Sequence, residues 1–269
     1  MPANRAHLDS DTDVRRPIIE IAGVSKTYRT RDGEVPSLRP LDFVVRDGEF
    51  VVVVGPSGCG KSTLLKLIAG LLPPSEGQIH VDGRRVVRPH GGVGIVFQTA
   101  MLLPWRSVIR NVMMPVEVKH LPRNVYEPRA ATLLKMVGLS GFEHKYPWQL
   151  SGGMQQRAAI CRALVHDPKI VLMDEPFGAL DAMTRERMNV ELQRIQRETQ
   201  KTVLLITHSI PEAVFLADRV LVMSERPGAI AAIYDVPLAR PRSLDVMADP
   251  VFVELTQTIR RHFNAQHLD

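Results

Sequence analysis

The 269-residue sequence contains no apolar run long enough to cross a membrane. Its strongest run extends from Phe50 to Val54, far short of the roughly 20 residues that a membrane-spanning helix requires. Residues 1–16 are polar and mixed in charge, and they lack the apolar central stretch of a secretory signal. We therefore expect the chain to stay in the cytoplasm, so that any role at a membrane depends on a partner.

Cysteine and metal chemistry also have little support. The two cysteines, Cys59 and Cys161, lack metal-site spacing, and the nine histidines include no close pair with a plausible third ligand. Both cysteines are expected to be reduced thiols. The net charge is +5, but there is no block of five or six like charges, so a solvated basic surface is the default interpretation. These absences argue against a zinc protein and against a dedicated nucleic-acid binder.

Four short segments are apolar at consecutive positions: 49–54, 170–173, 203–206 and 220–223. Strands buried on both faces, as in a parallel sheet covered by helices, have this pattern. Helical patterns lie between them, and the alternation predicts an α/β fold with a mostly parallel sheet and flanking helices. Residues 18–21 and 41–45, with a turn at Asp47-Gly48, predict an additional antiparallel β layer.

Residues 99–149 interrupt this alternation with helical spacing of Leu, Met, Val and Arg. We interpret 98–150 as a helical subdomain inserted into one larger domain that spans 18–235. The prolines in this stretch are predicted to break it into short helices; they stand at positions 104, 115, 122, 128 and 147.

The two ends of the chain are predicted to differ. Residues 1–17 are expected to be a disordered lead, and 236–269 a short C-terminal extension with a helix. Asp249 is suited to cap that helix and Pro250 to its first turn. Its apolar face is expected to comprise Val251, Leu255, Ile259 and Phe263.

Residues 55–62 fit the pattern G-x-x-x-x-G-K-[ST], directly after a buried strand and directly before a helical run. Glycines there allow a tight turn whose N–H groups point at phosphate oxygens. The following helix adds the positive end of its dipole. Lys61 is expected to reach the β- and γ-phosphates of ATP, and the Ser62 hydroxyl to bind Mg²⁺.

The apolar strand at 170–173 ends in two carboxylates, Asp174 and Glu175. Asp174 is expected to hold Mg²⁺ through water, and Glu175 to orient or deprotonate the attacking water. A strand that merely ends in polar residues is the alternative, but the phosphate loop makes hydrolysis the better interpretation. Together the two motifs predict a P-loop NTPase core.

Residues 150–157, Leu-Ser-Gly-Gly-Met-Gln-Gln-Arg, form a second possible anion-binding helix start, because Ser151 and two glycines precede a helical run. This start has no lysine of its own. It suggests closure over a nucleotide held by another copy of the chain, although an ordinary helix N-cap explains the same residues equally well.

Taken in order, residues 55–62, 150–156, 172–175 and His208 resemble the ATP-binding-cassette (ABC) ATPase family. The likeness covers about 18–233, and Leu-Ser-Gly-Gly-x-Gln is highly specific to that family. It implies ATP and Mg²⁺ as ligands and an ATP-dependent homodimer. It also implies integral-membrane permease subunits and, indirectly, a substrate-binding protein as partners, with the chain at the cytoplasmic face of the membrane.

The resemblance also assigns roles to single residues. Gln98 would contact Mg²⁺ and the attacking water, His208 the γ-phosphate, and the loop at 179–181 the opposite subunit. Tyr28, otherwise an ordinary half-buried tyrosine, would stack on adenine. The catalytic set is then Lys61, Gln98, Glu175 and His208, and the metal ligands are Ser62, Gln98 and Asp174. The expected nucleotide contacts are Tyr28, Gly55, Pro56, Ser57, Gly58, Cys59, Gly60, Lys61, Ser62, Thr63, Ser151, Gly152, Gly153, Gln155 and Asp181.

Within the family, the sequence is most similar to importer ATPases for nitrate, sulfonates and taurine. The likeness lies in residues 102–106, 176–185 and the tail Arg240-Pro241-Arg242. It implies import of a small anion, and the tail is too short for the long regulatory domain of maltose-type importers.

Two other functions stay open. An ABC ATPase acting on ribosomes or DNA is mildly favoured by the basic charge, but one cassette and no sustained heptads oppose it. The other is an exporter or lipid-transport motor.

Two further side chains carry predictions. Cys59 lies near a helix N-terminus and Lys61, so we expect a lowered pKa and greater reactivity than for Cys161. Trp105 either packs in the core of the helical insert or docks a short cytoplasmic helix of the permease.

Overall fold

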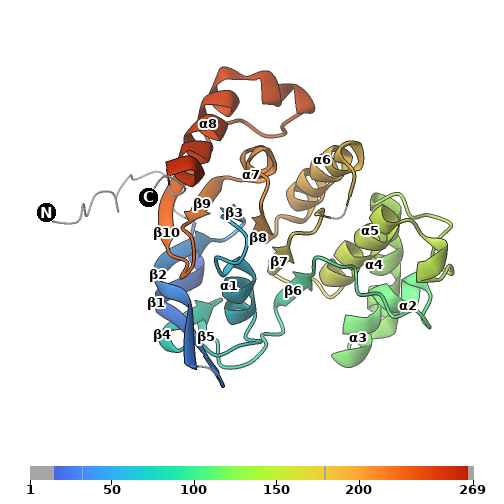
Figure 1. The fold of residues 1–269 in the computed structure, drawn as a ribbon. Coiled ribbons are helices and arrows are strands. Elements are labelled where there is room, and N and C mark those ends of the chain that lie inside the picture. Colours follow the sequence, from blue (N-terminus) through green and yellow to red (C-terminus); the bar gives the residue numbers. More distant parts are fainter. Residues whose placement is uncertain (1–14, 32, 179, 266–269) are drawn as a thin grey trace, which may run out of the picture.

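The N-terminal part of the chain builds an antiparallel sheet. The computed structural model describes residues 15–31, 33–178 and 180–265. In it β1 (Pro17–Thr30) pairs with β2 (Gly33–Arg46) on one side and β4 (Glu76–Val81) on the other, and β5 (Arg84–Arg85) lies at the edge (Figure 1). The predicted antiparallel layer is confirmed. Of the lead predicted as disordered only residues 15–17 are described, and Pro17 already begins β1.

A second, six-stranded sheet has the order β10-β9-β3-β8-β7-β6. Its neighbours from β9 to β6 run parallel, and only β10 is antiparallel, at the edge. The predicted mostly parallel sheet is therefore confirmed. Its strands are β3 (Phe50–Val54), β6 (Val93–Val96), β7 (Ile170–Asp174), β8 (Thr202–Thr207), β9 (Arg219–Met223) and β10 (Ile230–Asp235).

The central strand β3 supplies two cores at once. Phe50, Val52 and Val54 belong to a cluster on one face of the sheet, whereas Val51 and Val53 belong to a cluster on the other. All five side chains are fully buried. Successive side chains of a strand point to opposite faces, so an unbroken apolar run is what such a strand requires.

The helices divide between the two faces. In Figure 1, α1 lies between the antiparallel sheet and the mainly parallel sheet, and its buried leucines share one cluster with residues of both. Helices α2 to α5 form a separate group, and α6 to α8 cover the other face. Their bounds are α1 (Lys61–Ile68), α2 (Val108–Val112), α3 (Met114–Val118), α4 (Arg123–Met136), α5 (Gly152–Leu164), α6 (Ala182–Thr199), α7 (Ile210–Leu216) and α8 (Pro250–Ala265). Single 3-10 turns stand at Pro147–Gln149 and Leu244–Ala248.

The helical group matches the predicted pattern except at one proline. Pro115 and Pro122 lie at the starts of α3 and α4, where a missing N–H is tolerated. The prediction that Pro128 breaks the helix was wrong, because α4 continues through it. Beyond that residue, buried Leu133 and Leu134 pack into the same cluster as α5, and this packing keeps the helix continuous.

The C-terminal helix begins as predicted, and one residue of its predicted apolar face differs. Asp249 Oδ1 accepts a hydrogen bond from the Val251 N–H at 2.8 Å and caps α8. Val251 itself is 42% exposed, so its prediction as a core residue was wrong. Phe252 is buried in its place where α8 packs against α7. Ile259 is buried as predicted, and Leu255 and Phe263 pack against the same cluster. Within the described ranges, no helix is both long enough and apolar enough to span a bilayer.

Candidate functional site

The loop between β3 and α1 is shaped by glycines. Gly58 and Gly60 have φ values of 78° and 104°, where residues with a Cβ are strained. A Cβ at Gly60 would lie 2.5 Å from Leu38 Cδ2, so any larger residue at this position would require the Leu38 side chain or the loop to move. Among the described residues no side chain caps the start of α1. The N–H groups of its first turn are therefore suited to an anionic ligand.

Lys61 is nearly buried beneath this loop. Its Nζ donates to the carbonyl oxygens of Gly55 and Pro56, at 2.8 Å each. These partners are neutral, and charged oxygens form stronger bonds with an ammonium group. The side chain is thus folded along the loop, in reach of a phosphate held there.

Ser62 and Asp174 are brought together from α1 and the end of β7. The Ser62 Oγ donates to Asp174 Oδ1 at 3.0 Å. Burial raises the pKa of Asp174, and the bond from Ser62 only partly opposes this shift. A divalent cation beside the two oxygens would offset the desolvation cost of the ionised Asp174 carboxylate. Mg²⁺ prefers oxygen ligands and keeps phosphates and water as further ligands, so these residues fit it. The described residues contain no group of three or more His, Cys, Asp or Glu that could hold a metal by protein ligands alone.

Glu175 lies at the centre of a second polar group. Its Oε2 is 3.2 Å from His208 Nδ1 and 3.4 Å from Gln98 Nε2. The three residues follow β7, β8 and β6, which are adjacent parallel strands and therefore end at the same sheet edge. Glu175 has φ of 44°, an unfavourable conformation for a residue with a side chain and one that often marks functional sites.

Tyr28 lies beside the start of α1. Its hydroxyl is 3.2 Å from Thr63 Oγ1, which also accepts from the Ser37 hydroxyl at 3.3 Å. The Lys26 ammonium lies 5.5 Å from the centroid of the Tyr28 ring. The ring is half-buried next to the phosphate loop, and stacking on adenine stays a prediction.

The residues predicted to meet a second copy are exposed. Ser151 caps α5, with its Oγ accepting from the Met154 N–H at 3.3 Å. Asp181 caps α6, and its bond from Thr184 lowers the pKa of its carboxyl group. Gln155 differs, because its amide nitrogen donates to the carbonyl oxygens of residues 147 and 150 and thereby fixes the loop before Ser151.

A family model described as ABC transporter matches residues 38–178, about half of the chain. The chain belongs to the ABC transporter family. It is an ATP-binding subunit of that family and an ATPase.

Relatives of this ABC ATPase include named transport proteins. A taurine import ATP-binding protein (TauB) of Rhizobium johnstonii is 46% identical over 90% of this chain and 95% of the relative. A bicarbonate transport ATP-binding protein (CmpD) of Synechocystis sp. is 43% identical over 88% of this chain and 86% of the relative. Among solved structures, a dimeric ATP-binding cassette in a post-hydrolysis state, bound to ADP and Pi, has a TM-score of 0.72. It is 32% identical in sequence, and the matched region comprises 82% of this chain and 100% of the related chain.

One sequence prediction about the ABC site was wrong. Cys59 is fully buried in the cluster around α1, and burial raises its pKa despite the nearby Lys61. Its side chain packs inward against residues distant in sequence, and the desolvation outweighs the charge of the ammonium 4.0 Å away. Cys161 is also buried with a raised pKa, as predicted for an inert thiol.

Sequence reasoning missed a group of residues behind the ABC site. Buried Glu212 accepts a bond from the Thr207 hydroxyl, next to His208. Arg185 donates to the carbonyl oxygens of Phe177 and Leu180, which shapes the loop before Asp181. The Glu212 bond joins two side chains, and the Arg185 bonds join its guanidinium group to nearby backbone. No motif reports either contact, although Arg185 stood in a segment that the family resemblance had already singled out.

Proposed function

We propose that this ABC ATPase drives import of a small anion, such as nitrate, a sulfonate or taurine, through a separate permease. Two copies bind two ATP molecules head to tail. In this proposal residues 18–235 form the ATPase domain with the helical insert at 98–150, and 236–269 form an extension. A substrate-binding protein delivers the anion, and the chain works at the cytoplasmic face of the membrane.

The observation that carries the proposal is the division of polar groups between two surfaces. One edge of the parallel sheet holds Lys61, Ser62, Asp174 and Glu175, whereas the exposed helix start at Ser151 lies on the helical group. Ser151 has a backbone suited to a phosphate but no lysine beside it. A second copy that presents Ser151 to the first copy's nucleotide supplies the missing contact, as the dimeric related cassette supports.

At the sheet edge each residue performs a separate task. Lys61 exchanges its two carbonyl partners for phosphate oxygens and neutralises their charge. Ser62, Asp174 and Gln98 would hold Mg²⁺, which when bound offsets the charge that develops on the phosphates. Phosphoryl transfer depends mostly on such positioning and neutralisation.

The carboxylate of Glu175 accepts the proton of the attacking water. The Gln98 amide donates to this carboxylate, and His208 contacts the same oxygen, so together they fix its orientation. His208 also lies on the side where the γ-phosphate is expected.

The helical group supports contact with a permease. Trp105 is 70% exposed, which removes the core-packing alternative for this residue. Trp148 is 66% exposed, and its ring stacks on Tyr146 with centroids 4.6 Å apart. Contiguous exposed apolar patches mark interaction surfaces, and we propose that these rings belong to one. Trp105→Ala should spare ATP hydrolysis by the isolated chain and lower transport by the assembled complex.

The relatives' names support import of an anion with an oxygen-rich head group. Taurine carries a sulfonate, and bicarbonate is likewise an oxyanion. These names also favour transport over action on ribosomes or DNA.

A two-part experiment tests the proposal. The full chain should hydrolyse ATP only with Mg²⁺, and Glu175→Gln should lower the rate by about 10²–10⁴-fold. Glu186→Gln, an exposed control on α6, should not change it. The chain should co-purify from membranes with a permease and a binding protein whose melting temperature rises with taurine, an alkanesulfonate, nitrate or bicarbonate. Sedimentation with ribosomes, or no response to any of the four anions, would contradict the proposal.

A further inference from the structure

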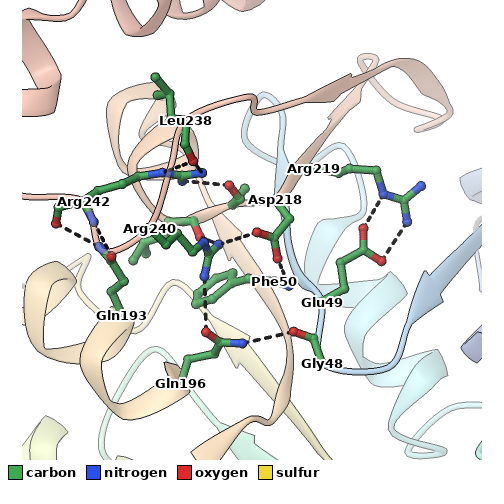
Figure 2. A network of polar contacts seen from close by, with 12 residues as sticks. Gly48, Glu49, Phe50, Gln193, Gln196, Asp218, Arg219, Leu238, Arg240 and Arg242 are labelled. Atoms are coloured by element: carbon green, nitrogen blue, oxygen red, sulfur yellow. Dashed lines mark hydrogen bonds and ion pairs between the residues drawn. The ribbon is translucent and has the colours of Figure 1, made fainter. Parts of the chain in front are cut away.

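The segment from Leu238 to Arg242 makes polar contacts that the proposed chemistry does not use. It follows β10 and contains the tail motif Arg240-Pro241-Arg242. Figure 2 shows both arginines directed into the molecule, toward α6, α7 and the start of β3, not toward solvent. Arg242 is buried and Arg240 is half-buried, although both side chains are charged.

Arg242 is bonded to the last turn of α7. It is only 3% exposed. Its Nη1 donates to the carbonyl oxygens of Val214, Phe215 and Ala217 at 3.1, 2.9 and 2.8 Å. Its Nη2 and Nε donate to the Leu238 carbonyl at 2.9 and 3.2 Å. The last carbonyls of a helix lack partners within the helix and carry partial negative charge, so the guanidinium completes the C-terminal end of α7.

The same residue is bonded to α6 through its backbone. The Arg242 N–H donates to Gln193 Oε1 at 2.5 Å, and Gln193 Nε2 donates back to the Arg242 carbonyl at 3.1 Å. Gln193 is buried, so this reciprocal pair is shielded from water. One turn further along α6, Gln196 Oε1 accepts from Arg240 Nη1 at 3.2 Å.

Arg240 fastens the segment to the sheet. Its Nη2 is 3.0 Å from Asp218 Oδ1 and also donates to the Leu216 carbonyl. The guanidinium lies 5.5 Å from the centroid of the Phe50 ring. Asp218 in turn accepts from the Phe50 N–H at 2.8 Å. The tail therefore contacts α6, α7 and the N-terminal end of β3 at one place.

The opposite ends of the two helices carry residues of the proposed site. Helix α6 begins at its cap Asp181, and α7 begins two residues after His208. Helix α7 has only seven residues, so its ends are about 10 Å apart. A shift at the end that Arg242 holds is transmitted directly to His208, whose Nδ1 must stay near Glu175.

We propose that residues 238–242 are a brace that holds α6 and α7, and that Arg242 is a positioning residue for ATP hydrolysis. The brace keeps His208 and Asp181 in place. This inference rests on the proposed function for the roles of those two residues.

The test compares two arginines at the same region of the sheet. Arg242→Lys keeps the charge but loses the planar fork that reaches several carbonyls. Arg219→Lys is the matched control, because Arg219 pairs with Glu49 (Figure 2). Arg219 also donates to the Val44 carbonyl. Hydrogen exchange of the full, nucleotide-free chain should be at least about tenfold faster over 206–213 in Arg242→Lys than in Arg219→Lys.

The second measurement is the steady-state kinetics of ATP hydrolysis. With assays kept below both melting temperatures, Arg242→Lys should lower kcat about tenfold while KM for ATP changes less than about twofold. Arg219→Lys should keep kcat within about twofold of the wild type. Gln193→Met, which removes the reciprocal pair from the α6 side, should mainly speed exchange over 180–187.

The outcomes separate the brace from the proposed function. Equal exchange in the two arginine variants, together with an unchanged rate over 180–187 in Gln193→Met, would overturn the brace. A parallel loss of kcat in Arg219→Lys would also overturn it, because the effect would then follow stability alone. A wild-type chain that does not hydrolyse Mg-ATP would contradict the proposed function, while the exchange measurement still judges the brace.

Discussion

Removal of the Ser151 hydroxyl separates a structural contribution from a functional one. In the free chain, Ser151 Oγ caps α5 through the Met154 N–H and is otherwise exposed. Loss of such a cap costs about 1 kcal/mol. For a chain of this size, that lowers the melting temperature by about 2–4 °C. In the proposed dimer the same hydroxyl also faces the partner's γ-phosphate.

The dimer should respond far more strongly than the fold. A hydrogen bond to a charged group contributes about 1.5–3 kcal/mol. A two-fold symmetric dimer contains the bond twice, so Ser151→Ala should weaken ATP-dependent dimerisation by about 3–6 kcal/mol. This corresponds to a dissociation constant raised by a factor of about 10²–10⁴.

The assay places Ser151→Ala in the Glu175→Gln background, which is expected to bind ATP without hydrolysing it. Light scattering over a concentration series with Mg-ATP gives the dissociation constant. Asp249→Ala is the control, since Asp249 caps α8 through a comparable bond of 2.8 Å. It should lower the melting temperature similarly and leave dimerisation unchanged. If Ser151→Ala dimerises within about threefold of its parent, the head-to-tail arrangement is wrong.

Four further outcomes are expected. Lys61→Met should lower ATP turnover at least about hundredfold with unchanged circular dichroism, and near-normal turnover would contradict contact with phosphate. The buried Cys59 thiol should react with a maleimide far more slowly than in the denatured chain, and fast labelling of the native chain would refute its inward orientation. Because burial raises the pKa of Asp174, Asp174→Asn should raise the melting temperature of the nucleotide-free chain at pH 7. Since the carboxyl is charged only above its raised pKa, that gain should shrink as the pH falls through this pKa toward the ordinary range of an aspartate, and a gain independent of pH would count against a buried charge. Gly60→Ala should lower the free energy of unfolding by about 2–4 kcal/mol in denaturant titrations, since φ is positive and Leu38 is too close, and an unchanged midpoint would contradict the strain.

The sequence predicted the strands that are buried on both faces. Strands β3, β7, β8 and β9 read as unbroken apolar runs, because helices cover both sides of the sheet. Strand β10 escaped prediction, since its residues alternate between half-buried and exposed at the edge. The direction of α8 toward the core also depends on what it packs against, so the spacing alone selected Val251 instead of Phe252.

Residue patterns selected the candidate site, but they did not predict the surroundings of each side chain. Asp174 ends β7 and Glu175 follows it, whereas Lys61 and Ser62 begin α1 after the loop that follows β3. Because β3 and β7 run in the same direction, these residues lie at one edge of the sheet. The expectation for Cys59 considered only its near neighbours in sequence. Its burial depends on segments far along the chain, such as Met223 across from Gly55, and no local pattern reports them.

The two carbonyls that hold Lys61 have a consequence for the cycle of the motor. A buried ammonium group left without partners when nucleotide departs would incur a large desolvation cost, and this cost would retard product release. The carbonyls of Gly55 and Pro56 lie within hydrogen-bonding distance of that ammonium, so Lys61 can exchange phosphate oxygens for carbonyl oxygens when nucleotide leaves. Lys61 thus has oxygen partners whether or not nucleotide is bound, and loss of nucleotide leaves no unpaired buried ammonium group.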